Sequence, residues 1–149
     1  MITSLANRVK AFNDVLEDGS LMSDIVREFE SEICEMNTEN QLFEKGVTAT
    51  GISIDTYAPY SAKTIEIKTV KNQPTDRVTL RDEGDFHRDF YLEITNQYFY
   101  ISSRDSKAEK LAEKYGEDIF GLTDENAELL TQEYIKPELL EKAREIIFG

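Results

Sequence analysis

Apolar residues recur at helical spacing in the two flanks of the chain. From Leu5 to Leu16 they return every three or four positions, and Ser4 can cap the N-terminus of the helix that they predict. A second stripe predicts a helix over residues 20–44, although Thr38 and Gln41 have the spacing of a capping box that would interrupt it. The short Asp18–Ser20 turn between the two helices favours an antiparallel helical hairpin.

The centre of the chain favours strands and loops. Residues 47–60 are rich in β-branched side chains and predict an extended segment that ends at Pro59. Residues 61–71 are ambiguous, because their alternation favours a strand whereas Ser61 can cap a short helix; residues 71–76 read as a loop. The stretch 90–103 predicts a β-hairpin that turns at Asn96–Gln97 and returns from Tyr98 to Ser102.

The C-terminal part returns to helical spacing. A helix is expected over residues 106–115, where Gly116 stops it, and another begins after Thr123 with acidic residues in its first turn. Pro137 either kinks one long helix or begins a second. These patterns predict one α+β domain over residues 1–149: a helical hairpin (1–46), a small, mainly antiparallel sheet with loops (47–104), and C-terminal helices packed on the sheet (105–149).

Charge sets limits on the function. The 149 residues include 30 acids and 17 bases, for a net charge of −13, and most of the negative charge lies in the two flanks. Such a surface argues against wrapping nucleic acid, which requires clustered cations. The apolar runs are too short for a membrane span or for a signal peptide, so no membrane partner is expected. A single cysteine, Cys34, excludes a disulfide within the chain.

Few residues suggest chemistry. His87 lies between Asp85 and Asp89, a trio that could act as a general base or bind a metal, but no second histidine or cysteine supports it. Cys34 is flanked by acids that would raise its pKa and make it a poor nucleophile. The acidic turn 82–85 lacks the spacing of a calcium loop. We therefore expect no catalytic, metal or cofactor site.

Three ordered motifs resemble a known family. They are Tyr60-Ser61-Ala62-Lys63-Thr64-Ile65 with Lys68 and Gln73-Pro74, the stretch from Val78 to Phe86 with Phe90, and Ile119 to Asn126. In this order they resemble the phage virion-morphogenesis and tail-completion proteins. Glu83, where the family usually has Thr, and Asp89, where it has a small polar residue, depart from the pattern. The resemblance implies a helix over residues 61–71, against their alternation.

The resemblance also implies a structural role. Such proteins form rings at the phage neck, or head–tail junction, where they complete the tail or connect it to the portal, without catalysis. The implied partners are other copies of the chain and other neck, portal or tail proteins, with genomic DNA passing nearby. The implied location is the virion, assembled in the bacterial host cytoplasm. The candidate interface residues, from extended and loop segments that could reach a neighbour, are Tyr57, Tyr60, Lys63, Lys68, Lys71, Arg77 and Arg81.

Two other functions compete with this one. The strong negative charge would suit a nucleic-acid mimic that occupies a basic site on a host protein. A small hydrolase or nuclease would depend on His87, Asp85 and Asp89.

Overall fold

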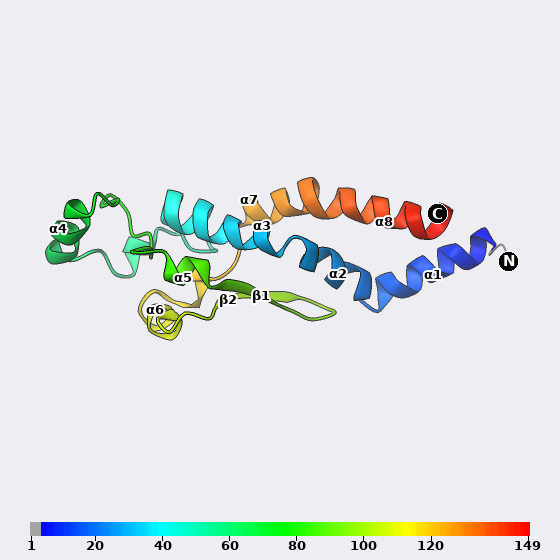
Figure 1. Ribbon diagram of the computed structural model, residues 1–149, viewed down its shortest axis with the longest axis horizontal. Helices are drawn as coiled ribbons and strands as arrows, with labels where there is room; N and C mark the ends of the chain where they lie inside the picture. The colour runs from blue at the N-terminus through cyan, green and yellow to red at the C-terminus, as the bar shows by residue number, and fades with distance from the viewer. Residues whose placement is uncertain (1–3) are drawn as a thin grey trace.

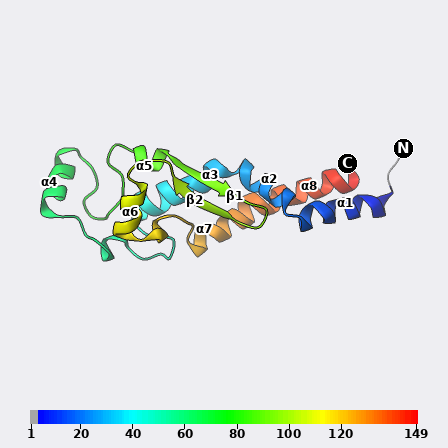
Figure 2. The same cartoon turned by 90° about the horizontal axis from the view of Figure 1, so that it is seen from below.

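Helices form the long axis of the molecule, and one β-hairpin lies beside their middle (Figures 1 and 2). The computed structural model describes residues 4–149. The N-terminal part consists of α1 (Leu5–Glu17), α2 (Ser20–Glu28), α3 (Glu30–Glu35) and the π-helical segment η1 (Met36–Lys45). Ser4 caps α1 as predicted, accepting a hydrogen bond of 3.2 Å from the Asn7 N–H.

The predicted pairing of the first two helices is wrong. The chain does turn at Gly19, which has a φ of 80°, but α2 continues along the long axis away from α1 (Figure 1). The helix that runs back beside α1 is α8 (Lys136–Phe148), so the two ends of the described chain meet at one end of the molecule. Helix α1 thus lies beside α8, a partner far away in the sequence, and its apolar side chains are only partly covered, with Leu5 50% exposed.

The second predicted helix is broken at a different place. The break lies at Phe29, whose φ of −104° and ψ of 17° leave the helical region, whereas residues 37 and 38 lie inside a helix. There Thr38 Oγ1 donates to the Cys34 carbonyl at 2.9 Å, a bond made within a helix, so Thr38 does not cap one. Gly46, with a φ of 63°, ends η1 at the predicted position.

The extended segment predicted over residues 47–60 does not form a strand. It contains one isolated bridge, between Val47 and Ser53, followed by the 3₁₀ helix η2 (Ile54–Thr56). Ile54 is fully buried, so its apolar side chain serves the core from a helical turn. β-branched residues favour a strand only where a neighbouring strand pairs with them, and the described chain supplies none here.

Residues 61–71 form the helix implied by the family resemblance. It is α4 (Ala62–Val70), and Ser61 Oγ caps it by accepting from the Thr64 N–H at 3.2 Å. Helix α4 stands at the end of the molecule opposite to α1 and α8 (Figures 1 and 2). A short helix, α5 (Asp85–Arg88), follows the returning loop.

The predicted hairpin is confirmed. Strand β1 (Phe90–Ile94) pairs antiparallel with β2 (Phe99–Ser103), and Leu92 lies opposite Ile101. The Leu92 N–H does not point to β2; it donates to Glu30 Oε2 on α3 at 2.8 Å. Because backbone groups alternate between the two sides of an antiparallel strand, those of Ile101 point away from β1. Glu30 thus covers the outer edge of β1. The outer edge of β2 is open as far as residues 4–149 are concerned, because none of them forms a further strand or bonds the backbone of Ile101 there.

The C-terminal part contains α6 (Ala108–Tyr115), the 3₁₀ helix η3 (Glu117–Ile119), α7 (Asp124–Leu129), the π-helical segment η4 (Leu130–Ile135) and α8. Thr123 caps α7 as predicted, and Pro137 stands in the first turn of α8, directly after η4. From α7 to α8 the chain leaves the hairpin region, and α8 runs along α2 and α1. The α+β fold is confirmed, with many helices and one antiparallel hairpin. No helix within residues 4–149 is long and apolar enough to cross a membrane.

A buried polar clamp fixes the C-terminal part to η1. Asn37 is fully buried; its Nδ2 donates to the Ile119 carbonyl at 3.0 Å and its Oδ1 accepts from the Gly121 N–H at 2.8 Å. One turn later Gln41 makes the same kind of pair. Its Nε2 donates to the Gly121 carbonyl at 2.8 Å, and its Oε1 accepts from the Thr123 N–H at 2.9 Å. The two side chains satisfy the backbone of a non-helical segment inside the core.

Candidate functional site

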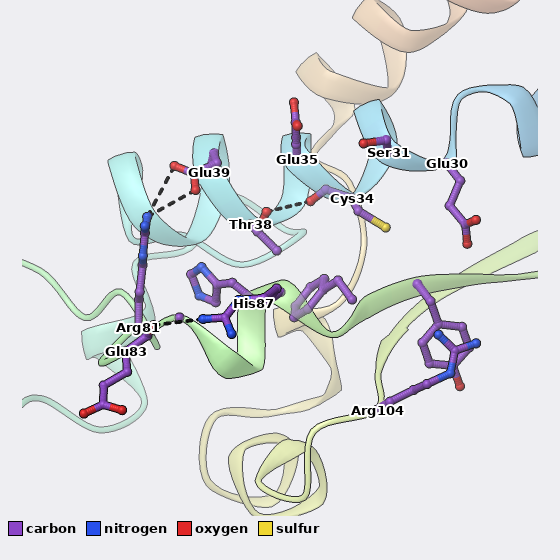
Figure 3. A pocket seen from close by; sticks show the side chains of 14 residues that line it. Glu30, Ser31, Cys34, Glu35, Thr38, Glu39, Arg81, Glu83, His87 and Arg104 are labelled. Carbon is purple, nitrogen blue, oxygen red and sulfur yellow. Dashed lines mark hydrogen bonds and ion pairs between the residues drawn. The ribbon is translucent and has the colours of Figure 1, made fainter.

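The residues that could take part in a reaction, Cys34 and His87, line a groove of about 620 Å³ between η1, α3 and α5 (Figure 3). Cys34 and Thr38 line one wall, and His87 and Phe90 line the other. Arg81 stands at one end, paired with Glu39 at 3.1 Å, and Arg104 stands at the other (Figure 3). The groove therefore brings the only histidine and the only cysteine of the chain to one place, which the sequence did not predict.

His87 is a neutral packing residue in this groove. It is 8% exposed, and its Nε2 lies 3.1 Å from the Thr79 carbonyl, so this nitrogen carries the proton. Burial, followed by the charge of Arg81, lowers the pKa of His87 from 6.5 to about 4. The expected partners Asp85 and Asp89 are exposed and make no hydrogen bond to the imidazole. The trio imagined for general-base chemistry therefore does not assemble.

Cys34 is equally unsuited to nucleophilic chemistry. Burial, together with the charges of Glu30 and Glu35, raises the pKa of the Cys34 thiol from 9.0 to about 11. At neutral pH the sulfur stays protonated, and a neutral histidine does not activate it.

The acidic turn is engaged by cations within the chain. Asp82 Oδ1 accepts from Lys71 Nζ at 2.8 Å, and this bond, with one from Gln73, lowers the pKa of Asp82. Asp85 pairs with Arg88 at 3.1 Å. Within residues 4–149 no three histidine, cysteine or acidic side chains converge as metal ligands would.

The candidate interface residues mostly anchor a projecting segment, which we name the α4 arm (residues 60–82). Tyr60 Oη accepts from the Thr79 N–H at 3.0 Å. Lys68 is 7% exposed; its Nζ donates to the Arg81 carbonyl at 3.0 Å and lies 5.0 Å from the centre of the Tyr60 ring. Lys71 pairs with Asp82. These bonds tie one side of α4 to the loop that follows it.

Two of the predicted cations hold the base of the arm. Arg77 Nε donates to the Phe43 carbonyl at 2.7 Å, and its guanidinium also pairs with Asp76. Arg81 lies 4.4 Å from the centre of the Phe43 ring. Phe43 of η1 thus receives two arginines from the arm, which fixes the arm to the body. Tyr57, in contrast, is 46% exposed and lies outside these contacts.

The other side of α4 is open to solvent. Lys63, Ile67 and Val70 follow one another at four- and three-residue steps, so they share one face of the helix; we name them the α4 stripe. Ile67 is 46% exposed and Val70 is 84% exposed. Lys63 makes no ion pair with any side chain of residues 4–149. The arm thus presents an apolar strip with one free cation.

A second groove, of about 590 Å³, runs beside the open edge of β2; we name it the β2 groove. Its apolar lining includes the partly exposed Phe99 of β2, Leu122, and Ile135 of η4. The buried core residues Ile101 and Leu130 also line it. Two acids, Glu93 and Glu117, also line it, and neither pairs with a cation of the described residues.

Sequence reasoning missed the polar clamp and the β2 groove. The clamp did leave a signal, because Ile33, Asn37 and Gln41 repeat every four residues and thus place two amides on the buried face of a helix. The β2 groove has no such signal in the sequence, because its lining residues are distant in the chain and come together only in the fold.

We compared the chain with protein-family models, with curated proteins and with solved structures, and none of the three comparisons found a match. The resemblance to the phage proteins therefore stays a prediction from the motifs.

Proposed function

We propose that the chain is a structural protein of the phage neck, or head–tail junction, which works by assembling into a ring with copies of itself and with other neck, portal or tail proteins. The observation that carries this proposal is the α4 arm. Its internal bonds hold it in a defined shape, yet Ile67 and Val70 on its outer face are in water. Apolar side chains presented by an ordered projection are typical of a surface that another protein covers.

The state of the reactive groups supports a role without catalysis. The imidazole of His87 is neutral and engaged with Thr79, and the thiol of Cys34 is held protonated. The motifs that resemble tail-completion proteins lie in the arm and in the segment held by the clamp, so the resemblance and the exposed apolar surface fall on the same part of the chain.

The proposal is tested in a phage that carries the gene. Quantitative mass spectrometry of purified particles should find the chain at a fixed number of copies per portal. Deleting the gene should leave heads and tails that electron microscopy shows unjoined. Complementation with Ile67→Asp should fail, whereas Leu140→Asp, a change at an exposed apolar residue of α8, should restore joined particles.

Two results would overturn the proposal. One is a chain that is absent from particles whose assembly is normal without the gene. The other is tight, salt-sensitive binding to a host DNA-binding protein, which the nucleic-acid mimic requires and which a titration at low and high salt detects.

A further inference from the structure

We propose that the α4 stripe of one copy docks in the β2 groove of a second copy. This inference rests on the proposed function and identifies the two surfaces that join neighbouring subunits. Both surfaces exist on every copy, so one contact repeated around an axis would close a ring.

The two surfaces match in polarity. The α4 stripe offers Ile67 and Val70. The β2 groove offers the partly exposed apolar side chains of Phe99, Leu122 and Ile135. Packing one against the other removes both from water, which is the main favourable term in association.

The two surfaces also match in charge. The α4 arm carries five cations and three acids in a chain with a net charge of −13. Lys63 is exposed and makes no ion pair within the described residues, whereas Lys68, which makes none either, is buried. The β2 groove is lined by Glu93 and Glu117, which likewise pair with no described cation. Opposite charges at the border of an apolar contact fix its register and disfavour other partners. Acidic surfaces elsewhere on the chain would repel one another.

The contact has to form between molecules. Helix α4 stands at one end of the long axis, whereas β2 and α7 lie in the middle of the molecule (Figure 1). The contacts of Arg77 and Arg81 with Phe43 fix the arm at its base, and the bonds of Tyr60 and Lys68 hold its shape. The stripe therefore cannot fold back onto the groove of its own chain while these contacts persist. A subunit therefore gives its arm to one neighbour and receives the arm of another.

Cysteine cross-linking tests the contact directly in the full chain. In a Cys34→Ser background, one copy carries Ile67→Cys and the other carries Thr131→Cys, a residue that lines the groove. Mild oxidation should give a disulfide between the two copies, identified by peptide mass spectrometry. The matched control replaces Thr131→Cys by Leu140→Cys on α8, outside the groove, and should give at least roughly tenfold less cross-linked dimer.

Charge reversal provides the second test. Lys63→Glu should weaken self-association, measured by sedimentation equilibrium at low salt, by roughly three- to tenfold. Adding Glu117→Lys to the same chain should restore most of the loss, whereas adding Glu128→Lys on α7, outside the groove, should not. Circular dichroism confirms that each variant is folded.

The outcomes separate this inference from the proposed function. An assembly in which residue 67 cross-links elsewhere, or in which Glu117→Lys gives no rescue, overturns the docking and leaves the neck role standing. A chain that stays monomeric at every concentration and salt also overturns the docking. A cross-link between residues 67 and 131 in a chain absent from virions would support the docking and refute the neck role.

Discussion

Gly19 lies directly against the backbone carbonyl of Asn96, so the turn after α1 touches the tip of the β-hairpin. A Cβ at position 19 would collide with the Asn96 carbonyl oxygen, and the φ of 80° is one that only glycine adopts without strain. This contact joins the first helical break to the one sheet of the described chain.

We predict that Gly19→Ala destabilises the fold through this contact. Gly51 provides a matched control, because its φ of 79° is nearly the same and a Cβ there would meet no atom within 4 Å. Both variants carry the left-handed strain of about 1–2 kcal/mol. Gly19→Ala should lose about 1–3 kcal/mol more in free energy of unfolding, measured by urea denaturation, because the hairpin tip must move. Equal losses in the two variants would show that the hairpin tip yields without cost.

The polar clamp should be essential to the core. Asn37→Leu leaves the Ile119 carbonyl and the Gly121 N–H without their partners, and each buried unpaired group costs about 1–3 kcal/mol. We therefore expect a loss of about 2–5 kcal/mol in free energy of unfolding. Asn40→Ala is the control: Asn40 bonds only the Asn126 side chain, at 3.0 Å, so its loss should stay below about 1 kcal/mol. Similar losses for the two variants would contradict the role of the clamp.

The buried imidazole of His87 should make stability depend on pH. The pKa of His87 falls from 6.5 to about 4 on folding, so between these values the unfolded chain binds more protons than the folded one. The contribution is fully present above pH 6.5 and is lost as the pH falls towards 4. The loss at the lower limit should be about 3 kcal/mol.

His87→Gln isolates this effect, because glutamine does not titrate and can still donate a hydrogen bond to the Thr79 carbonyl. Urea denaturation of the two proteins at several pH values gives their difference in free energy of unfolding. That difference should shrink between pH 6.5 and 4. A difference that is the same throughout this range would refute the neutral, buried state of the imidazole.

The thiol of Cys34 should react slowly. With a pKa of about 11 in place of 9.0, its thiolate fraction at pH 8 is lower by about a hundredfold. Iodoacetamide labelling followed by mass spectrometry should therefore be at least that much slower in the folded chain than in urea, and should accelerate as the pH rises. Equal rates in the two states would mean that the sulfur is neither buried nor influenced by Glu30 and Glu35.

Local signals predicted the elements whose causes are local. Ser4 and Thr123 cap the helices that the sequence assigns to them, and Gly46 and Gly116 stop theirs. The hairpin was predicted from its alternation, with β2 starting one residue later than expected. Helix α4 is the exception, because alternation favoured a strand and the family resemblance favoured the helix that forms.

The remaining errors concern partners distant in the sequence. An apolar stripe on residues 4–17 predicts that another helix lies against this one but does not say which, and α8 lies there where α2 was expected. Residues 47–60 have strand composition, but no neighbouring strand is there to pair with them. The bonds of Tyr60 and Lys68 likewise depend on Thr79 and Arg81, in a loop whose position in the fold the sequence does not predict.

The Leu92 N–H donates to the carboxylate of Glu30, so the two edges of the small sheet differ: one is capped and the other is not. A two-stranded ribbon with both edges bare could lengthen sideways in either direction, and copies could stack without limit as they do in fibrils. Because Glu30 closes one edge, a strand of another molecule can add only at the edge of β2. The hairpin therefore cannot extend into an endless sheet, and Glu30→Ala would expose the edge of β1 to strand addition.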